Sequence, residues 1–530
     1  MSFYQNGVRD ERVREYLPVQ RVLWQQDCRN AGQLAGNCAL QIELGENGDV
    51  PEVDEGGGIL LDFGCELHGG VRLLSVGESG VQVRLRFGES VSEAMGTPNQ
   101  DHAMHDAVLT LPVLGMLEYG NTAFRFVRLD AVKGKLRLMN VLAVALFRDL
   151  EYTGCFHSSD GRLNKIWATA VYTVHLNMQD YIYDGVKRDR LVWMGDMNPE
   201  VRGILCAFRD TALIAGTLDF LRETTPLPRM MNGIPSYSCW WVITIYDYYL
   251  HSGDFAWLSA QRGYLMELLG ILVTFVDGKG SECIPPFRFL DWPNDSNEAA
   301  KHAGLQGLLL WTLQRGIALG KILDFDTSVI AATARRMRQC IPDCGESKAA
   351  AAMQCLSGLA DRTGVLLRNP FCGVSTFYGY YMLQAMPVHN ALELIRRYWG
   401  AMLDYGATTF WEDFDLGWIR NAASIAELPP PGKNDLHADF GNYCYKGLRH
   451  SLCHGWACGP APFLSERVLG VHILEPGCRR LRIAPELCGL EYLQGRFPTP
   501  QGAVEIQVER GRPPLIKAPG SIQIEEGTPG

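Results

Sequence analysis

The sequence lacks the features of membrane-spanning and secreted proteins. Its 530 residues contain no apolar run of the ~18 residues that crossing a bilayer requires. Residues 1–18 lack the apolar stretch that a signal peptide carries. The formal net charge is −10, so the chain has no basic excess for binding nucleic acid or an anionic membrane. We therefore expect a cytoplasmic protein with neither nucleic acid nor a membrane among its partners.

Several motifs of well-understood chemistry are also absent. The chain has no G-x-x-x-x-G-K-[ST], G-x-G-x-x-G, G-x-S-x-G or H-E-x-x-H, which disfavours nucleotide hydrolysis, α/β-hydrolase chemistry and zincin proteolysis. Its 16 cysteines form no C-x-x-C pair, and we expect them to be reduced thiols. His102 and His105 have no further cluster of ligands beside them in the sequence, so we predict no metal site and no cofactor.

The length and composition indicate a folded protein of several domains. A typical domain has roughly 150 residues, and 47% apolar residues with 20% charged residues exclude intrinsic disorder. Within the first 150 residues, segments such as 81–87 and 124–129 alternate apolar and polar side chains, as half-buried strands do. Short strands separated by Gly and Asn turns predict an N-terminal β-sandwich.

The pattern becomes helical near residue 155. From Leu163 to Val174 apolar residues recur at helical spacing, and Ser159 and Asp160 precede them as candidate N-caps. Further helices are expected at 240–250, 264–276, 303–323, 329–339, 349–359, 376–385 and 389–399, with helical character to about 465. About a dozen helices would form antiparallel hairpins around an axis, a solenoid or a bundle. We predict domains at 1–152, 153–465 and 466–530, the last one being β.

One acidic and aromatic segment suggests a sugar-binding site. Residues 181–196 contain three aspartates and three basic residues among tyrosines and a tryptophan, and they follow a predicted helix. A solvated salt-bridge loop is the alternative, but it would leave large aromatic rings exposed. Carboxylates beside arginines and an aromatic wall can bind sugar hydroxyls, stack on the ring and transfer a proton.

Three further segments combine acids or histidine with tryptophan. In 406–415, Glu412 follows Trp411, although a capped helix beginning at Thr408-Thr409 would give Glu412 a purely structural role. The others are 289–295 and 451–456, and the histidine of the latter would serve equally well in a core. Together the four segments favour a carbohydrate hydrolase.

These segments resemble the α-L-rhamnosidases of glycoside hydrolase family 78. The stretch Asp184-Gly-Val-Lys-Arg188-Asp189-Arg190-Leu-Val-Trp193-Met-Gly195-Asp196 is similar to the family pattern D-x-x-x-R-D-E-R-x-x-W-x-G-D. Residues 406–412 resemble its G-A-T-T-x-W-E block, 291–292 its D-W element and 451–456 its histidine block. Residues 61–73 and 85–89 are similar to the β-sandwich before the family's catalytic domain, so the resemblance covers roughly 55–510.

The resemblance implies a multi-domain α+β protein with an (α/α)6 barrel flanked by N-terminal and C-terminal β-sandwiches. It also implies inverting hydrolysis that releases terminal α-L-rhamnose without a cofactor. The chain is short for the family, which favours small rhamnosides over polymers. The expected partner is therefore a small-molecule glycoside, and a homodimer is compatible with the sequence.

The first motif departs from the family pattern at its central acid. The usual R-D-E-R is one residue shorter here and reads Arg188-Asp189-Arg190. In the family the glutamate of this motif is the general acid, and by position the role passes to Asp189. Two alternatives stay open: Asp196 donates the proton while Asp189 binds hydroxyls, or the shortened motif makes a weak or altered enzyme.

The remaining roles follow from the same resemblance. Glu412 is expected to activate a water on the opposite face of the sugar, with the two catalytic carboxyls about 6.5–9.5 Å apart, whereas about 5–5.5 Å would mean retention. The expected substrate-binding residues are Asp184, Arg188, Trp193, Asp196, Trp240, Asp291, Trp292 and His454, the three tryptophans forming the walls.

Two other functions fit the same sequence features. One is a different glycosidase on the same helical toroid, such as an unsaturated uronyl hydrolase, whose site should present basic groups to a sugar carboxylate. The other is a carbohydrate-binding pseudoenzyme, which the lost glutamate makes conceivable.

Overall fold

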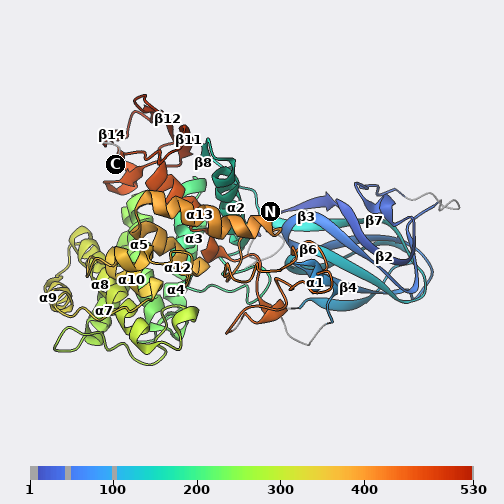
Figure 1. Ribbon diagram of the computed structural model, residues 1–530, viewed down its shortest axis with the longest axis horizontal. Helices are drawn as coiled ribbons and strands as arrows, with labels where there is room; N and C mark the ends of the chain where they lie inside the picture. Colours follow the sequence, from blue (N-terminus) through green and yellow to red (C-terminus); the bar gives the residue numbers. More distant parts are fainter. Residues whose placement is uncertain (1–9, 42–48, 98–103, 444, 528–530) are drawn as a thin grey trace, which may run out of the picture.

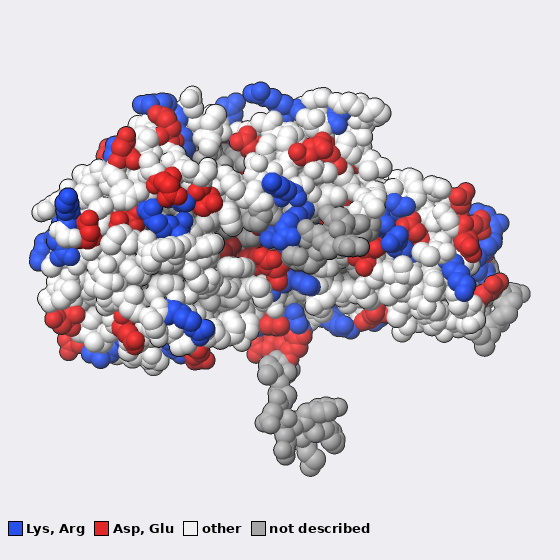
Figure 2. Space-filling model, turned by 90° about the horizontal axis from the view of Figure 1, so that it is seen from below, with Lys and Arg blue, Asp and Glu red and all other residues white. Residues whose placement is uncertain are grey.

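The computed structural model describes residues 10–41, 49–97, 104–443 and 445–527. One end of the molecule is a large β-sheet, and the other is a body of helices with small C-terminal sheets beside it (Figure 1). His102 lies outside the described residues. No helix within the described ranges combines the length and apolarity needed to cross a membrane. On the face in Figure 2, described basic and acidic side chains are interspersed, without a broad basic area.

In the described part of the chain, seven strands form the N-terminal sheet. Their order is β1-β7-β3-β6-β4-β5, and β2 pairs with β3. The strands are β1 (Arg12–Pro18), β2 (Arg21–Arg29), β3 (Glu52–Val76), β4 (Gln82–Gly88), β5 (Asp106–Thr110), β6 (Leu114–Lys133) and β7 (Leu136–Arg148). The alternating segments 81–87 and 124–129 fall on β4 and β6. Side chains such as Val83, Leu85 and Leu129 are fully buried in this sheet's own apolar core.

One short helix interrupts this otherwise β region, which the alternating pattern did not predict. It is α1 (Val91–Met95), and the Ser90 hydroxyl caps it by accepting from the backbone N–H of Glu93 at 3.1 Å. Glu93 in turn accepts from the backbone N–H of Glu89 at 2.8 Å. Glu93 thus bonds back to the residue before the N-cap, one position earlier than in a capping box, and the side chains of Glu89 and Glu93 are both buried.

The helical body begins with the expected cap. Asp160 accepts from the backbone N–H groups of Arg162 and Leu163 at the start of α2. The helices are α2 (Gly161–Asn177), α3 (Met197–Ala207), α4 (Ala212–Thr224), α5 (Pro235–Ser252), α6 (Phe255–Ala260), α7 (Arg262–Leu272), α8 (Glu298–Leu323), α9 (Ser328–Met337), α10 (Lys348–Leu356), α11 (Thr363–Leu367), α12 (Thr376–Ala385), α13 (Val388–Asp404) and α14 (Pro460–Phe463).

Six of these helices contact one another in a closed series. The successive pairs are α3/α5, α5/α8, α8/α10, α10/α12, α12/α14 and α14/α3. Helix α5 is buried on nearly all sides, as expected for a helix that is apolar all round. The other described helices, including α2, α4, α7 and α13, lie outside this series and pack against it.

The segment between α13 and α14 departs from the expected helical pattern. Its described residues form only 3-10 turns and irregular backbone, and 429–432 read Pro-Pro-Pro-Gly, which cannot continue a helix. The alternative in which a capped helix begins at Thr408-Thr409 is excluded, because residues 407–413 are not helical. Long irregular segments in compact domains are often functional.

The N-terminal sheet holds this irregular segment in place. The guanidinium of Arg125 donates to the carbonyl of Gly406 at 3.1 Å, and the hydroxyl of Thr408 accepts from the backbone N–H of Glu66 at 2.9 Å. The sheet therefore fixes the approach to the segment that carries Glu412.

Two small sheets close the structure beside the helices. One has the order β13-β12-β11-β8 and the other β14-β10-β9. Their strands are β8 (Cys155–Ser158), β9 (Val471–Ile473), β10 (Arg480–Ile483), β11 (Tyr492–Phe497), β12 (Val504–Glu509), β13 (Leu515–Lys517) and β14 (Gln523–Glu526). The chain thus contributes β8 to the C-terminal sheet before it enters α2. Val471, Leu481 and Val504 belong to the same apolar core as the helices.

Candidate active site

The first acidic segment forms the loop between α2 and α3. The backbone N–H and carboxylate of Asp184 bond to the carbonyl and N–H of Leu191, both at 3.1 Å, which closes the loop on itself. At its tip Asp189 and Arg190 have φ values of 57° and 55°, a left-handed conformation that is unfavourable for such residues. The shortened R-D-R motif therefore forms a tight, strained turn that presents Asp189.

The second and fourth segments lie side by side and face this loop. The Glu412 backbone N–H donates to the carbonyl of Ser451 at 3.0 Å, and the His454 N–H donates to the carbonyl of Phe410 at 3.0 Å. The hydroxyl of Thr409 donates to the carbonyl of Leu452 at 2.7 Å. The Gly455 N–H donates to the carbonyl of Asp184 at 2.8 Å, which ties the pair to the first loop.

These loops enclose a cavity of about 150 Å³ above the helical ring. Eight of the ten predicted site residues line it: Asp184, Arg188, Asp189, Trp193, Asp196, Trp292, Glu412 and His454. The structure adds Ile234, Tyr237, Phe287, Phe289 and Trp456. Phe289 and Trp456 belong to segments that the sequence singled out. The other three lie outside the acidic clusters, so no sequence signal marked them.

Arg188 links the two predicted catalytic carboxyls. One of its terminal nitrogens contacts Oε1 of Glu412, and the other lies 3.2 Å from Oδ2 of Asp189. The side chains of Arg188 and Glu412 are buried, at 5% and 4% exposure, whereas that of Asp189 is 26% exposed. A guanidinium between two carboxylates fixes both through charge-assisted hydrogen bonds. Glu412 therefore lies deep in the cavity and Asp189 lies at its mouth.

His454 stands among three carboxyls as a neutral ring. Its Nε2 lies 3.5 Å from Glu412 and 4.0 Å from Asp184, and its Nδ1 lies 3.8 Å from Asp196. Burial, reinforced by the charge of Arg188, holds the pKa of His454 well below its ordinary value. Its Nδ1 has no hydrogen-bond partner among the described residues. A neutral imidazole with a free nitrogen is suited to binding a substrate hydroxyl.

The acids at the floor of the cavity favour their protonated forms. Burial raises the pKa of both Asp184 and Asp196 well above the ordinary value. The neighbouring carboxyl of Asp189 raises the pKa of Asp184 further, and that of Asp184 raises the pKa of Asp196 further. Burial and the neighbouring carboxyls also raise the pKa of Glu200 well above its ordinary value. Neither carboxyl oxygen of Glu200 has a hydrogen-bond partner in the described structure. Asp196 thus remains a candidate proton donor beside Asp189.

Two predicted site residues are not brought to the cavity. Trp240 lies in the core of the helical ring, with its ring stacked on Tyr381 at 4.8 Å, because α5 buries it among other helices. Asp291 accepts from the hydroxyl of Ser375 at 2.7 Å, at the N-terminus of α12. Burial raises the pKa of Asp291 to about 7. Neither residue is among those that line the cavity, so a substrate-binding role for them stays a prediction.

One wall of the cavity is aromatic. Trp193 packs edge-on against Tyr237 at 6.3 Å, and Phe289 packs against Trp292 at 4.9 Å. The ring of His454 lies 4.3 Å from that of Trp456. The cavity thus opposes an apolar wall to a polar floor, as many sugar sites do.

One group of side chains in the described residues has the geometry of metal ligands. It consists of Glu89, Glu93 and His437, whose ligand atoms lie within 4.8 Å of one another. The ammonium of Lys187 lies 2.8 Å from Glu93 and 3.5 Å from Glu89 and already supplies positive charge there. Both nitrogens of His437 are hydrogen-bonded, to the hydroxyl of Ser90 and the carbonyl of His450. These residues therefore form an internal ion-pair cluster.

One protein-family model matches the first part of the helical region. Residues 151–307 match the family model of the bacterial alpha-L-rhamnosidase 6 hairpin glycosidase domain. No curated protein matches the chain by sequence. The family-model match confirms, for these residues, the resemblance that the motifs implied.

Solved structures share the fold at low sequence identity. The GH78 family rhamnosidase of Bacillus sp. GL1 aligns with a TM-score of 0.72 and 21% identity, over 92% of this chain and 54% of that one. The rhamnosidase from Klebsiella oxytoca with rhamnose bound gives 0.69 and 22%, over 86% and 96%. The Streptomyces avermitilis alpha-L-rhamnosidase complexed with L-rhamnose gives 0.71 and 17%, over 97% and 50%. The chain therefore spans about half the length of the Bacillus and Streptomyces proteins.

Proposed function

We propose that the chain is an inverting glycoside hydrolase that releases terminal α-L-rhamnose from small rhamnosides. The observation that carries the proposal is the cavity in which Arg188 holds Glu412 at the floor and Asp189 at the mouth. The closed series of six helices supports an (α/α)6 barrel at 153–465, flanked by β-sandwich domains at 1–152 and 466–530.

Glu412 is proposed as the general base. Its Oε2 accepts from the backbone N–H of Ser451 at 3.1 Å, and its Oε1 contacts Arg188, so the carboxylate is held in one orientation. A fixed carboxylate beside an enclosed space can draw a proton from a water as that water attacks the anomeric carbon. Inversion needs room for this water between the two catalytic carboxyls.

Asp189 is proposed as the general acid, with Asp196 as the alternative. Asp189 stands at the mouth, where the leaving group of a terminal sugar must emerge, and its strained turn projects it toward that opening. Asp196 lies at the floor, and burial favours its protonated form. In that position Asp196 is better placed to bind a hydroxyl of the sugar than to reach the departing oxygen.

The lining suits a neutral 6-deoxy sugar. Asp184, Asp196 and His454 offer donors and acceptors for hydroxyl groups on one side. The aromatic wall of Trp193, Tyr237 and Trp292 faces them and suits the C6 methyl group. A volume of about 150 Å³ accommodates a single sugar unit, which supports small substrates.

A uronyl hydrolase is disfavoured by the charge of the lining. Among the described residues that line the cavity, Arg188 is the only arginine or lysine, and it already contacts two carboxylates. A sugar carboxylate would find no further cation and would face several acids. The pseudoenzyme alternative is left to experiment.

The test is hydrolysis of p-nitrophenyl α-L-rhamnopyranoside by the wild type and by Asp189→Asn and Glu412→Gln. We expect release by the wild type, a large loss in Glu412→Gln and a smaller loss in Asp189→Asn, because p-nitrophenolate departs with little protonation. Proton NMR of the earliest product should show β-rhamnose if the enzyme inverts, and α-rhamnose would contradict inversion. Rhamnose binding without any release would favour the pseudoenzyme.

A further inference from the structure

A second polar cavity, of about 340 Å³, lies on the far side of the helical ring from the candidate active site. Helices α3, α5 and α12 reach both places: their N-terminal ends approach the active-site cavity, and residues from their C-terminal halves line the second one. Along α5, Tyr237 lines the first cavity and Asp247 the second, which at 1.5 Å per residue places them about 15 Å apart. Arg315 of α8, Phe497 of β11 and five residues between Glu466 and Ile473 complete the lining.

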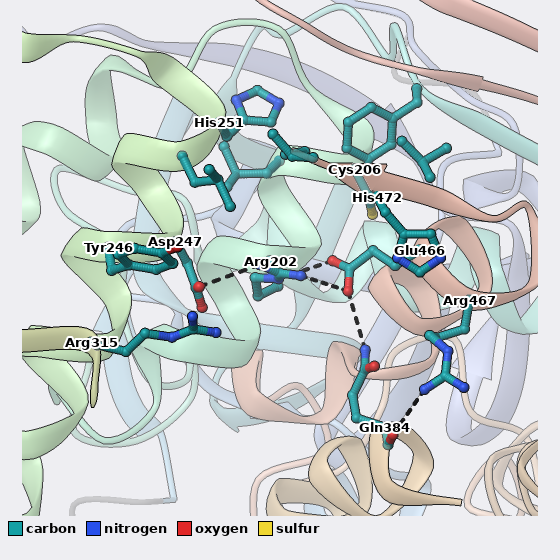
Figure 3. Close-up of a pocket in the computed structure, with 15 residues that line it drawn as sticks. Arg202, Cys206, Tyr246, Asp247, His251, Arg315, Gln384, Glu466, Arg467 and His472 are labelled. Atoms are coloured by element: carbon teal, nitrogen blue, oxygen red, sulfur yellow. Dashed lines mark hydrogen bonds and ion pairs between the residues drawn. The ribbon is translucent and has the colours of Figure 1, made fainter. Parts of the chain in front are cut away.

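The two acids of this cavity share one arginine. Arg202 lies between them, with its Nε 2.9 Å and a terminal nitrogen 2.7 Å from Glu466, and the other terminal nitrogen 3.6 Å from Asp247 (Figure 3). The side-chain amide of Gln384 also donates to Glu466 at 3.2 Å, and that of Asn198 donates to Asp247 at 3.2 Å. Arg202 balances one of the two negative charges, so a second arginine in the lining makes the cavity neutral and a third leaves it positive.

Two further arginines line the same cavity without an acidic partner among the described residues. The guanidinium of Arg315 lies over the ring of Tyr246 at 4.3 Å, and its buried Nε makes no hydrogen bond within the described structure. The guanidinium of Arg467 donates to the backbone carbonyl of Gln384 at 2.9 Å. Figure 3 shows them on opposite sides of the Arg202–Glu466 pair, Arg315 near Asp247 and Arg467 near Gln384.

The surroundings of His472 give an independent sign of positive potential. Its ring lines the cavity, and its pKa is lowered to about 4, by burial and then by the charges of Arg482, Arg467 and Arg202. Burial disfavours the protonated imidazole most, and the nearby arginines add to this. Three arginines face two carboxylates in the lining, so the cavity carries a formal excess of one positive charge.

We propose that this cavity is a second binding site, for a small oxyanion that carries a carboxylate or phosphate group and is no larger than a monosaccharide. Arg315 or Arg467 would bind the anionic group, because guanidinium groups match carboxylate and phosphate geometry and remain charged. Stacking on Tyr246 holds the Arg315 guanidinium in place before the ligand arrives, which reduces the ordering cost of binding.

The site is independent of the proposed hydrolysis. The second cavity and the active-site cavity have no lining residue in common, so an anion bound in one leaves the other open to sugar. We therefore expect the anion and rhamnose to bind at the same time.

Isothermal titration calorimetry with the full chain tests the proposal. Sodium phosphate and sodium glucuronate are the two anionic probes, and glucose is the neutral control, all at constant ionic strength. We expect saturable heat for one or both anions, none for glucose, and no change in anion affinity when rhamnose is present. The anion that binds with the higher affinity shows whether the site prefers a phosphate or a carboxylate group. If neither anion binds, the proposal is overturned.

Variants locate the binding. At least one of Arg315→Gln and Arg467→Gln should weaken the binding of the preferred anion about tenfold or more, which is about 1.4 kcal/mol. The control is Arg335→Gln on the exposed face of α9, which should bind like the wild type. If a glutamine variant fails to fold, the lysine variant at that position keeps the charge and should bind more weakly than arginine. Unchanged affinity in folded Arg315 and Arg467 variants would place the anion elsewhere and refute the site.

Discussion

Glu412 and Ser451 hold each other through two hydrogen bonds. The Glu412 backbone N–H donates to the Ser451 carbonyl at 3.0 Å, and the Ser451 N–H donates to Oε2 of the Glu412 side chain at 3.1 Å. The proposed base is therefore oriented by a segment 39 residues away in sequence. Fixing a reactive group in advance in this way reduces the reorganisation needed during the reaction.

Replacing Glu412 by glutamine should remove the base and keep this geometry. The amide oxygen can still accept from Ser451, but the side chain can no longer take a proton. We expect kcat on p-nitrophenyl α-L-rhamnopyranoside to fall about 10²–10⁴-fold, the usual contribution of a general base. Rhamnose binding by calorimetry should persist. A kcat within a few fold of the wild type would exclude Glu412 as the base.

The choice between Asp189 and Asp196 as the acid can be made with two leaving groups. A p-nitrophenolate departs with little protonation, whereas the alkoxide of methyl α-L-rhamnopyranoside needs a proton. Asp189→Asn should therefore lose much more activity on the methyl glycoside than on the nitrophenyl one. Asp196→Asn should lose similar activity on both, because it removes a substrate contact. If instead Asp196→Asn lost much more kcat/KM on the methyl glycoside than on the nitrophenyl one, and Asp189→Asn lost similar amounts on both, the general acid would be Asp196.

Lys187 should be a major source of stability between the N-terminal sheet and the helices. Its ammonium lies 2.8 Å from Glu93, and both side chains are at most 2% exposed. Lys187→Met would leave buried carboxylates without a cation and should lower the free energy of unfolding by about 3–5 kcal/mol. Urea denaturation measures this.

The matched control for this variant is an exposed ion pair. Arg368 lies 2.7 Å from Glu346, but both side chains are more than 60% exposed. Arg368→Ala should therefore change the stability by less than about 1 kcal/mol. Equal effects of the two substitutions would mean that the buried cluster does not stabilise the fold.

The sequence predicted local elements better than it predicted their neighbours. The capped helix after Asp160 and the helix at 376–385 were visible because apolar periodicity and capping are local properties. Trp240 does not line the cavity, and the sequence could not show this, because α5 is apolar on nearly all sides and its pattern cannot say which side faces the cavity. Tyr237 and Phe287 were missed because they have no acid beside them in the chain.

The irregular segment after α13 was the largest error of element type. Its apolar residues suggested helices, but its backbone is held by tertiary bonds, such as those from Arg125 to Gly406 and from Glu412 to Ser451. Such bonds join residues that are distant in sequence and leave no periodic signal. The acidic and aromatic composition of the segment still marked it as functional, because that composition reflects the chemistry of a site more than local structure.

Asp291 should make the stability of the fold depend on pH. Burial raises its pKa from an ordinary value of 3.8 to about 7, so between these values the folded state binds a proton that the unfolded state has lost. Its contribution is fully present below about pH 4 and is lost as the pH rises through about 7. The size is of the order of 1 kcal/mol for each pKa unit.

Asp291→Asn should remove this contribution. The asparagine amide can still accept from the hydroxyl of Ser375, so the contact at the N-terminus of α12 is retained. Urea denaturation at pH 5 and pH 7.5 should therefore show a smaller loss of stability on raising the pH in the variant than in the wild type. The buried acids Asp184 and Asp196 have raised pKa values in both proteins and leave a common residual slope. An identical pH dependence in variant and wild type would show that Asp291 is ionised in the folded protein across this range.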